Sequence, residues 1–249
     1  MNKIKNVVTD NIKTILILLV VAIAAFTVYN AIILRNVEEK QINVTGLGTV
    51  NFQSDLIVWS GSFSQIAPNM RDAYTRLSAD QESIRRFLKS KSISEKDYKF
   101  SSVNINKEYD MIIDNNGNQT QVFKGYRLNQ DLTIESKEVD KIEQLSREIT
   151  ELINSGVELY SQPPQYYYTK LSELKMKLIE IGTKNAKERA ETIAKMSGYK
   201  LGTLKYANMG VFQIIAQNSN EDFSWDGSFN TDSKMKTATI TIRLQFGIK

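Results

Sequence analysis

The side chains that most often carry enzyme chemistry are missing, because the 249 residues include no cysteine and no histidine. Thiolate nucleophiles, Ser-His-Asp triads and histidine-ligated metal sites are therefore excluded. Carboxylate, lysine or tyrosine chemistry and metals with oxygen ligands remain, and two acids in one cleft are the catalytic groups of glycoside hydrolysis. The candidate pairs are Glu188 with Glu191 and Glu221 with Asp222. Both pairs stand in polar stretches, so we expect solvated acids rather than a catalytic pair.

Two further patterns resemble ligand sites. Gly46-x-Gly48 has the glycine spacing of a phosphate loop. It lacks a following helix and any Gly-Lys-Ser/Thr, so we interpret the glycines as strand positions that another element approaches closely. Residues 114–118 (DNNGN) begin like a calcium loop, but Gly125 stands where the bidentate acid is required. We expect a hairpin turn there, and we predict no metal and no cofactor.

Tyrosines and methionines each allow two interpretations. Residues 166–168 are three tyrosines that follow two prolines. They either stack on a glycan or peptide, or form an edge strand with alternate tyrosines in the core, which we favour. Methionines are able to scavenge oxidants. Met70, Met111 and Met196 stand at apolar positions of predicted helices and strands, so we predict that they pack in the core.

The aromatic residues Phe223, Trp225 and Phe229 interrupt the polar segment 217–236. Exposed aromatics in a polar loop often bind a neighbouring subunit, a partner or a lipid surface. The alternative is that this loop is disordered. These three residues are the predicted interaction loop.

Residues 15–34 (ILILLVVAIAAFTVYNAIIL) contain no charged side chain, and about 20 apolar residues suffice for a membrane-spanning helix. Three lysines and one aspartate precede them, so the positive-inside rule keeps residues 1–14 in the cytoplasm and exports the rest. A cleaved signal peptide is the alternative, with an Ala-x-Ala site at 22–24. The apolar residues that continue to Leu34 favour a retained anchor.

Charge argues against a nucleic-acid partner. The formal net charge is +4, and residues 1–14 supply +2 of it through three lysines and one aspartate. No cluster of lysines and arginines with interleaved aromatics is present, so no nucleic-acid surface is predicted.

The rest of the chain predicts an α+β fold. Residues 35–41 are a polar linker, and residues 42–249 show two strand-strand-helix units, then a short strand, a long helix and further strands. We expect mostly antiparallel sheets with helices on one face, and a hairpin between the first two strands. Period-two stretches predict strands at 42–52, 56–63, 98–111, 122–134, 166–168, within 204–216 and at 238–248. Helical spacing predicts helices at 70–88, at 139–153 with Ser136 as N-cap and Gly156 after the end, and at 169–197 before Gly198.

The long helix carries a ridge of small residues at every fourth position, which lets it lie close to a sheet or another helix. The ridge residues are Gly182, Ala186, Ala190 and Ala194.

Four stretches resemble motifs of the SIMPL-domain family of bacterial envelope proteins. The first, residues 44–50 (VTGLGTV), is similar to the family's V-x-G-x-G-x-V strand. The Ala-Pro-Asp that usually follows is reduced here to Asp55. The others are residues 125–128 (GYRL), 186–194 with Gly198 and Leu201-Gly202, and 239–244 (TITIRL). The resemblance covers residues 41–249 and implies an α+β fold, an envelope location, ring-like homo-oligomers and, in some members, a role in oxidative-stress defence. It implies no catalytic residues.

Together these observations predict an inner-membrane, single-pass protein whose C-terminal domain lies in the periplasm. We expect a self-assembling structural or interaction module rather than an enzyme. The alternatives are a carboxylate-based envelope hydrolase, a module that binds a hydrophobic ligand or partner, and a periplasmic protein released by signal cleavage.

Overall fold

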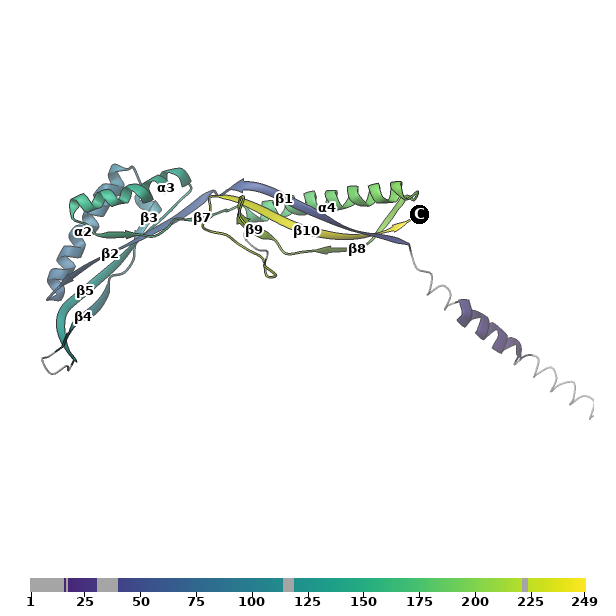
Figure 1. The fold of residues 1–249 in the computed structure, drawn as a ribbon, viewed down its shortest axis with the longest axis horizontal. Helices are drawn as coiled ribbons and strands as arrows, with labels where there is room; N and C mark the ends of the chain where they lie inside the picture. The colour runs from purple at the N-terminus through teal and green to yellow at the C-terminus, as the bar shows by residue number, and fades with distance from the viewer. Residues whose placement is uncertain (1–15, 17, 31–39, 114–118, 221–223) are drawn as a thin grey trace, which may run out of the picture. The chain divides into compact units, whose positions relative to one another are not determined.

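The computed structural model describes residues 16, 18–30, 40–113, 119–220 and 224–249 (Figure 1). The chain divides into two compact units. Of the described residues, the smaller unit contains those up to Asn43 with Ala190–Tyr206 and Gln245–Lys249, and the larger contains those within Val44–Arg189 and Ala207–Leu244. Most helices and strands lie in the larger unit.

Residues 18–30 are helical, and their apolar side chains are exposed, as in Leu18 (63%) and Phe26 (65%). Within the described ranges, no helix combines the length and the apolar character needed to cross a membrane. The predicted anchor 15–34 lies partly outside the described residues, as does nearly all of the linker 35–41. Residues 1–14 lie wholly outside them.

The larger unit contains a six-stranded sheet with order β3-β5-β2-β6, to which β4 adds beside β5 and β7 beside β2. All of its pairings are antiparallel. The strands are β2 (Leu56–Ala67), β3 (Tyr98–Phe100), β4 (Asn104–Ile113), β5 (Gln119–Ser136), β6 (Leu159–Ser161) and β7 (Gln165–Tyr167).

The helices α2 (Met70–Ser90) and α3 (Val139–Glu148) pack against β2 and β5. In α2, Ala73, Leu77 and Ile84 recur at helical spacing and are buried, which gives the helix one apolar face. They join a single hydrophobic cluster with Trp59 of β2 and Ile134 of β5, which stand opposite each other. Because both helices contribute to this one cluster, they cover the same face of the sheet.

The second sheet has the order β1-β10-β8, with β9 antiparallel to β10. Its strands are β1 (Gln41–Gln53), β8 (Leu201–Met209), β9 (Gln213–Ala216) and β10 (Met235–Ile248). In β10 every second residue from Ala238 to Leu244 is buried, the pattern of a strand with one covered face. The long helix α4 (Leu171–Met196) packs on this face (Figure 1).

The predicted hairpin of the first two strands is wrong, because β1 pairs with β10 and β2 pairs with β5. The chain passes from one sheet to the other at Ser54 and Asp55. The Ser54 N–H donates to Lys234 O at 2.9 Å, and the Asp55 N–H donates to Tyr167 O at 3.0 Å. Alternating side chains identify a strand but not the neighbour that pairs with it.

Other predictions about local structure hold, with shifts. The second predicted helix is α3 followed by a 3₁₀ segment, η2 (Ile149–Ser155), which ends at Gly156 with φ of 79°. The N-cap is Glu138 instead of Ser136, whose Oγ accepts from the Glu138 N–H at 3.1 Å. The predicted strand 98–111 is split into β3 and β4, and η1 (Glu95–Asp97) precedes β3. The predicted turn 114–118 lies outside the described residues.

Candidate functional site

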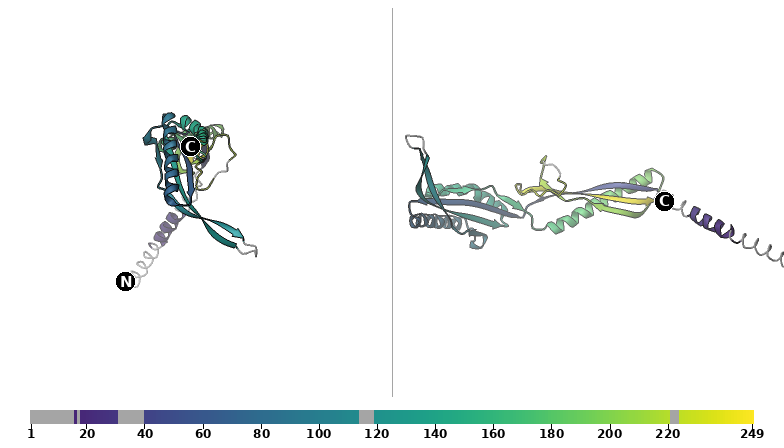
Figure 2. Two further views of the ribbon diagram at one scale, coloured as in Figure 1. Left: turned by 90° about the vertical axis from the view of Figure 1, so that its left-hand side faces the viewer. Right: turned by 90° about the horizontal axis from the view of Figure 1, so that it is seen from below.

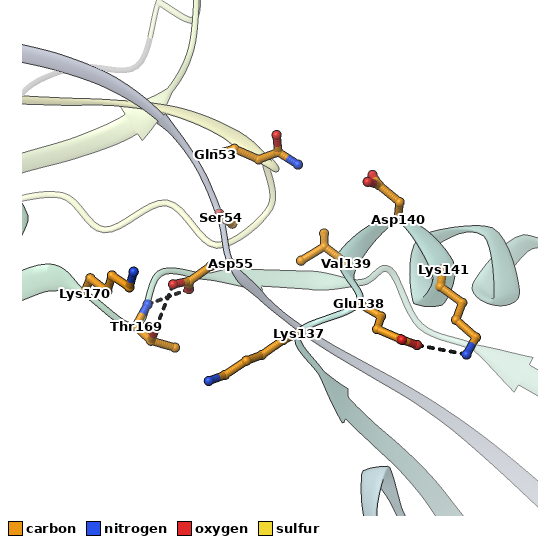
Figure 3. Close-up of a pocket in the computed structure, with 10 residues that line it drawn as sticks. All are labelled: Gln53, Ser54, Asp55, Lys137, Glu138, Val139, Asp140, Lys141, Thr169 and Lys170. Carbon is orange, nitrogen blue, oxygen red and sulfur yellow. Dashed lines mark hydrogen bonds and ion pairs between the residues drawn. The ribbon is translucent and has the colours of Figure 1, made fainter. Parts of the chain in front are cut away.

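An open depression of about 660 Å³ lies where the chain leaves β1 for β2, beside the first residues of α3 and α4 (Figure 3). Three acids and three lysines dominate its lining, so it is a charged surface rather than an apolar pocket. The lining residues, together called the charged junction, are Gln53, Ser54, Asp55, Lys137, Glu138, Val139, Asp140, Lys141, Thr169 and Lys170.

Asp55 connects this junction to the start of α4. Its carboxylate accepts from the Thr169 N–H and from the Thr169 Oγ1, both at 2.7 Å. Charge-assisted bonds of this kind are about twice as strong as neutral ones. Asp55 is thus a positioning residue for the helix that covers the second sheet. Next to it, Ser54 is buried, and its Oγ has no hydrogen-bond partner among the described residues.

The other two acids of the depression are also bound to partners. Glu138 accepts from Lys141 Nζ at 2.8 Å, a contact drawn in Figure 3. Asp140 accepts from Lys234 Nζ at 2.5 Å, and the same ammonium donates to Glu143 at 2.8 Å. These two acceptors raise the pKa of Lys234 far above its ordinary value. The lining acids therefore serve as anchors for lysines of neighbouring segments.

A second depression, of about 560 Å³, lies beside the predicted interaction loop, and its lining is mostly apolar. Trp225 stands at its edge with 96% of its surface exposed. Gln213 is buried and holds the loop: its Nε2 donates to Ser224 O at 2.6 Å, and its Oε1 accepts from the Ser224 N–H. Phe229 is 45% exposed, and Phe223 lies outside the described residues. The lining residues are Leu47, Asn208, Gly210, Val211, Gln213, Ser224, Trp225, Thr239, Ile240, Thr241 and Arg243.

The small residues of α4 lie against the glycines of β1. A Cβ atom added to Gly46 would come within 2.1 Å of Gly182 O and 2.5 Å of Ala186 N. Ala190 and Ala194, which continue the ridge in the smaller unit, are buried as well. Both sets of small residues are visible in the sequence. Taken together, they could have indicated that α4 packs closely on β1.

One surface was missed by sequence reasoning, a two-stranded arm formed by residues 108–113 of β4 and 119–125 of β5 (Figure 2). There β5 pairs with β4 alone, because its pairing with β2 begins at Tyr126. Alternation places Tyr109, Met111 and Ile113 on one face with Phe123, and all four are at least 44% exposed.

The opposite face carries two ion pairs: Asp110 with Lys124 at 2.9 Å within the arm, and Glu108 with Arg127, just beyond the arm, at 2.6 Å. The prediction that Met111 packs in the core is wrong, and so are those for Met70 and Met196, which are 43% and 82% exposed. An alternating pattern predicts one buried face only where a second layer covers the strand.

The model of the family SIMPL, described as a protein of unknown function (DUF541), matches residues 42–246. The chain belongs to the SIMPL family. The match begins in β1, includes the charged junction, the arm and the Trp225 depression, and ends in β10. No protein among the curated sequences compared with the chain matches it.

In this SIMPL domain the three acids of the charged junction are all engaged by other residues. Glu138 and Asp140 each accept a hydrogen bond from a lysine, and Asp55 accepts from Thr169. Among all the described residues, no group of three or more acids is placed so that it could bind a metal ion. Glu188 and Glu191 lie on α4, while Glu221 and Asp222 fall outside the described residues.

The ion pair of Lys234 predicts a pH-dependent stability for this SIMPL domain. The pKa of Glu143 is lowered, chiefly because Lys234 donates to its carboxylate, while partial burial opposes the shift. As the pH falls, the unfolded chain takes up this proton first, so the stabilisation is present above the ordinary carboxyl pKa and is lost as the pH falls through the folded value. We expect Lys234→Met to lower the free energy of unfolding by about 1 kcal/mol near neutral pH, and by much less near pH 3.

Urea unfolding of the variant and the parent at both pH values measures this difference. Lys137→Met is the matched control, since Lys137 lines the depression that contains Asp140 and has no ion pair among the described residues. An effect of Lys234→Met that is independent of pH would contradict the assignment.

Proposed function

We propose that this SIMPL protein is tethered to the inner membrane by residues 15–34 and exposes its α+β domain in the periplasm. There it acts by associating with copies of itself, as a structural or interaction module of the envelope. The uncharged apolar segment supports the tether, and the envelope location that the resemblance of the sequence motifs implies agrees with it. The observation that carries self-association is the apolar face of the arm.

A two-stranded ribbon is marginally stable alone in water, so it gains most from a partner that covers it. In the arm the charges are paired within one face, and the opposite face presents Tyr109, Met111, Ile113 and Phe123. Two such faces are mutually complementary, because their contact buries aromatic and aliphatic groups of both copies without leaving a charge unpaired. A second copy therefore suits this surface.

The four-stranded sheet offers a second contact for further copies. Its order, β1-β10-β8, leaves one edge of β1 and one edge of β8 without a neighbouring strand among the described residues. An open edge is a template for pairing with another chain. If β8 of one copy pairs with β1 of the next, the contact is head-to-tail, which closes a ring or extends a filament.

Assembly is tested by light scattering on the full chain after size exclusion. We expect the parent to be oligomeric and the triple variant Tyr109→Thr, Met111→Thr, Phe123→Thr to show a lower mass. Threonine keeps the strand propensity while removing the apolar surface. The matched control is Ile112→Thr with Val122→Thr, which removes exposed apolar groups from the other face of the same arm and should assemble like the parent. A monomeric parent, or a triple variant of unchanged mass, would refute the proposal.

Location is tested separately by membrane fractionation and by a reporter fused to the C-terminus. We expect the full chain in the membrane fraction with the reporter on the periplasmic side. A released, shortened chain would support signal cleavage instead, and a soluble cytosolic chain would exclude the tether.

A second candidate function is the binding of a hydrophobic ligand or partner at the predicted interaction loop. The observation in its favour is the mostly apolar depression beside the exposed Trp225. We expect the replacement of Phe223, Trp225 and Phe229 by serine to abolish binding without unfolding the domain.

A further inference from the structure

We infer that the depression beside Trp225 binds a small amphiphile with one negative head group, such as the anion of a fatty acid. This inference rests on the second candidate function above and names its ligand class. It concerns a single surface, made by β1, β10 and the segments on either side of β9.

The depression has the size and lining of a small-molecule site. Its volume of about 560 Å³ lies within the range typical of ligand pockets. Leu47 and Val211, which are 48% and 46% exposed, supply aliphatic surface, and the indole ring of Trp225 supplies an aromatic face. The two reciprocal hydrogen bonds between Gln213 and Ser224 hold the residue before Trp225 against this surface.

One row of lining residues on β10 is polar and includes a positive charge. Thr239, Thr241 and Arg243 occupy alternate positions of β10, so their side chains point to the same face of the sheet, away from the buried Ile240 and Ile242. Among the described residues, Arg243 has no ion-pair partner, and no aspartate or glutamate lines the depression. A guanidinium binds a carboxylate through two parallel hydrogen bonds, and the threonine hydroxyls add further donors.

The apolar surface and the arginine together determine the class of ligand. An apolar surface without the arginine would take a neutral hydrophobe, and a lone arginine without that surface would take any small anion. Their combination favours a molecule with an apolar chain and a single anionic group.

The tryptophans of the chain provide a reporter at the site itself. The sequence contains two, and Trp59 is fully buried in the core with its Nε1 donating to Ser161 Oγ. Only Trp225 is therefore open to a quencher. A ligand that covers it should shift its fluorescence to the blue and protect it from acrylamide.

The full chain is titrated with decanoate, decanol, decyltrimethylammonium or acetate, and the protection of Trp225 from acrylamide is measured. The chain is held in phosphatidylcholine vesicles, or in buffer if it stays in the aqueous phase. We expect decanoate to protect Trp225 at a concentration about tenfold lower than decanol or the cation, and acetate to have no effect. Arg243→Gln should weaken decanoate binding by about tenfold and leave decanol unchanged. Arg71→Gln, which changes an exposed arginine of α2, is the matched control and should bind like the parent. Partitioning into lipid is the same for the parent and the variants, so it does not affect their comparison.

Equal protection by decanoate, decanol and the cation would overturn the ligand class while leaving hydrophobic binding in place. No protection by any of them would overturn both this inference and the second candidate function. Neither result bears on self-association, which the mass measurement decides.

Discussion

Gly46→Ala is expected to lower the free energy of unfolding by about 3 kcal/mol, at the upper end of the usual cost of overpacking. The added Cβ atom would lie 2.1 Å from Gly182 O and 2.7 Å from Ala186 Cβ. The nearest of these atoms belongs to the backbone of α4, so no rotation of a side chain relieves the clash. Gly48 meets the same helix, since its Cβ would lie 2.2 Å from Leu178 O. The helix would have to move away from the sheet to accept either alanine.

Denaturant unfolding followed by circular dichroism measures this loss. Gly247→Ala is the matched control, because Gly247 also lies in a strand and its Cβ would meet only the end of the Lys205 side chain, at 3.4 Å. We expect the control to change stability by less than about 1 kcal/mol. A Gly46→Ala variant as stable as the control would contradict the close contact between Gly46 and the backbone of α4.

Lys236→Met is expected to cost about 3 kcal/mol of stability, although it replaces a charged side chain by an apolar one of similar length. Lys236 is only 1% exposed, and its Nζ donates to Tyr166 O at 2.9 Å and to Asn230 O. The ammonium thereby joins β7 and the segment before β10 to the core. Methionine fills the space of the aliphatic stem, but it leaves these carbonyl oxygens without their charged donor.

The same unfolding assay measures this effect, with Lys99→Met as its control. Lys99 lies on β3, is exposed, and has no side-chain bond among the described residues. The control should change stability by at most about 0.5 kcal/mol. A Lys236→Met variant that is as stable as the parent would mean that the buried ammonium is not needed to hold these segments.

Much of the local structure could be predicted, because it depends on neighbours in sequence. The spacing of Ala73, Leu77 and Ile84 predicts α2, and Gly156 and Gly198 mark helix ends through left-handed conformations, with φ of 79° and 78°. The partner of β1 could not be read in this way. The alternating pattern of β1 fits a strand of either sheet, because both sheets have one covered face. Which strand pairs with β1 therefore depends on packing between segments that are distant in sequence.

The candidate sites show the same division. Trp225 was identified from the composition of the surrounding segment alone, since an aromatic residue stands out in a polar segment. The depression beside it was not, because Leu47, Val211 and Arg243 come from three distant stretches of the chain. The arm was misread for a similar reason. Tyr109 and Met111 alternate like core residues, and only the tertiary structure shows that no layer covers them.

The sequence by itself determined the composition-based exclusions, the periodic elements, the family motifs and the uncharged apolar segment. Only the tertiary structure decided which strands pair, that Gly182 and Ala186 of α4 lie on the glycines of β1, and which apolar groups remain open to a partner. The physical reason is that helix and strand periods arise within a few residues, whereas pairing and burial depend on which distant surfaces fit together.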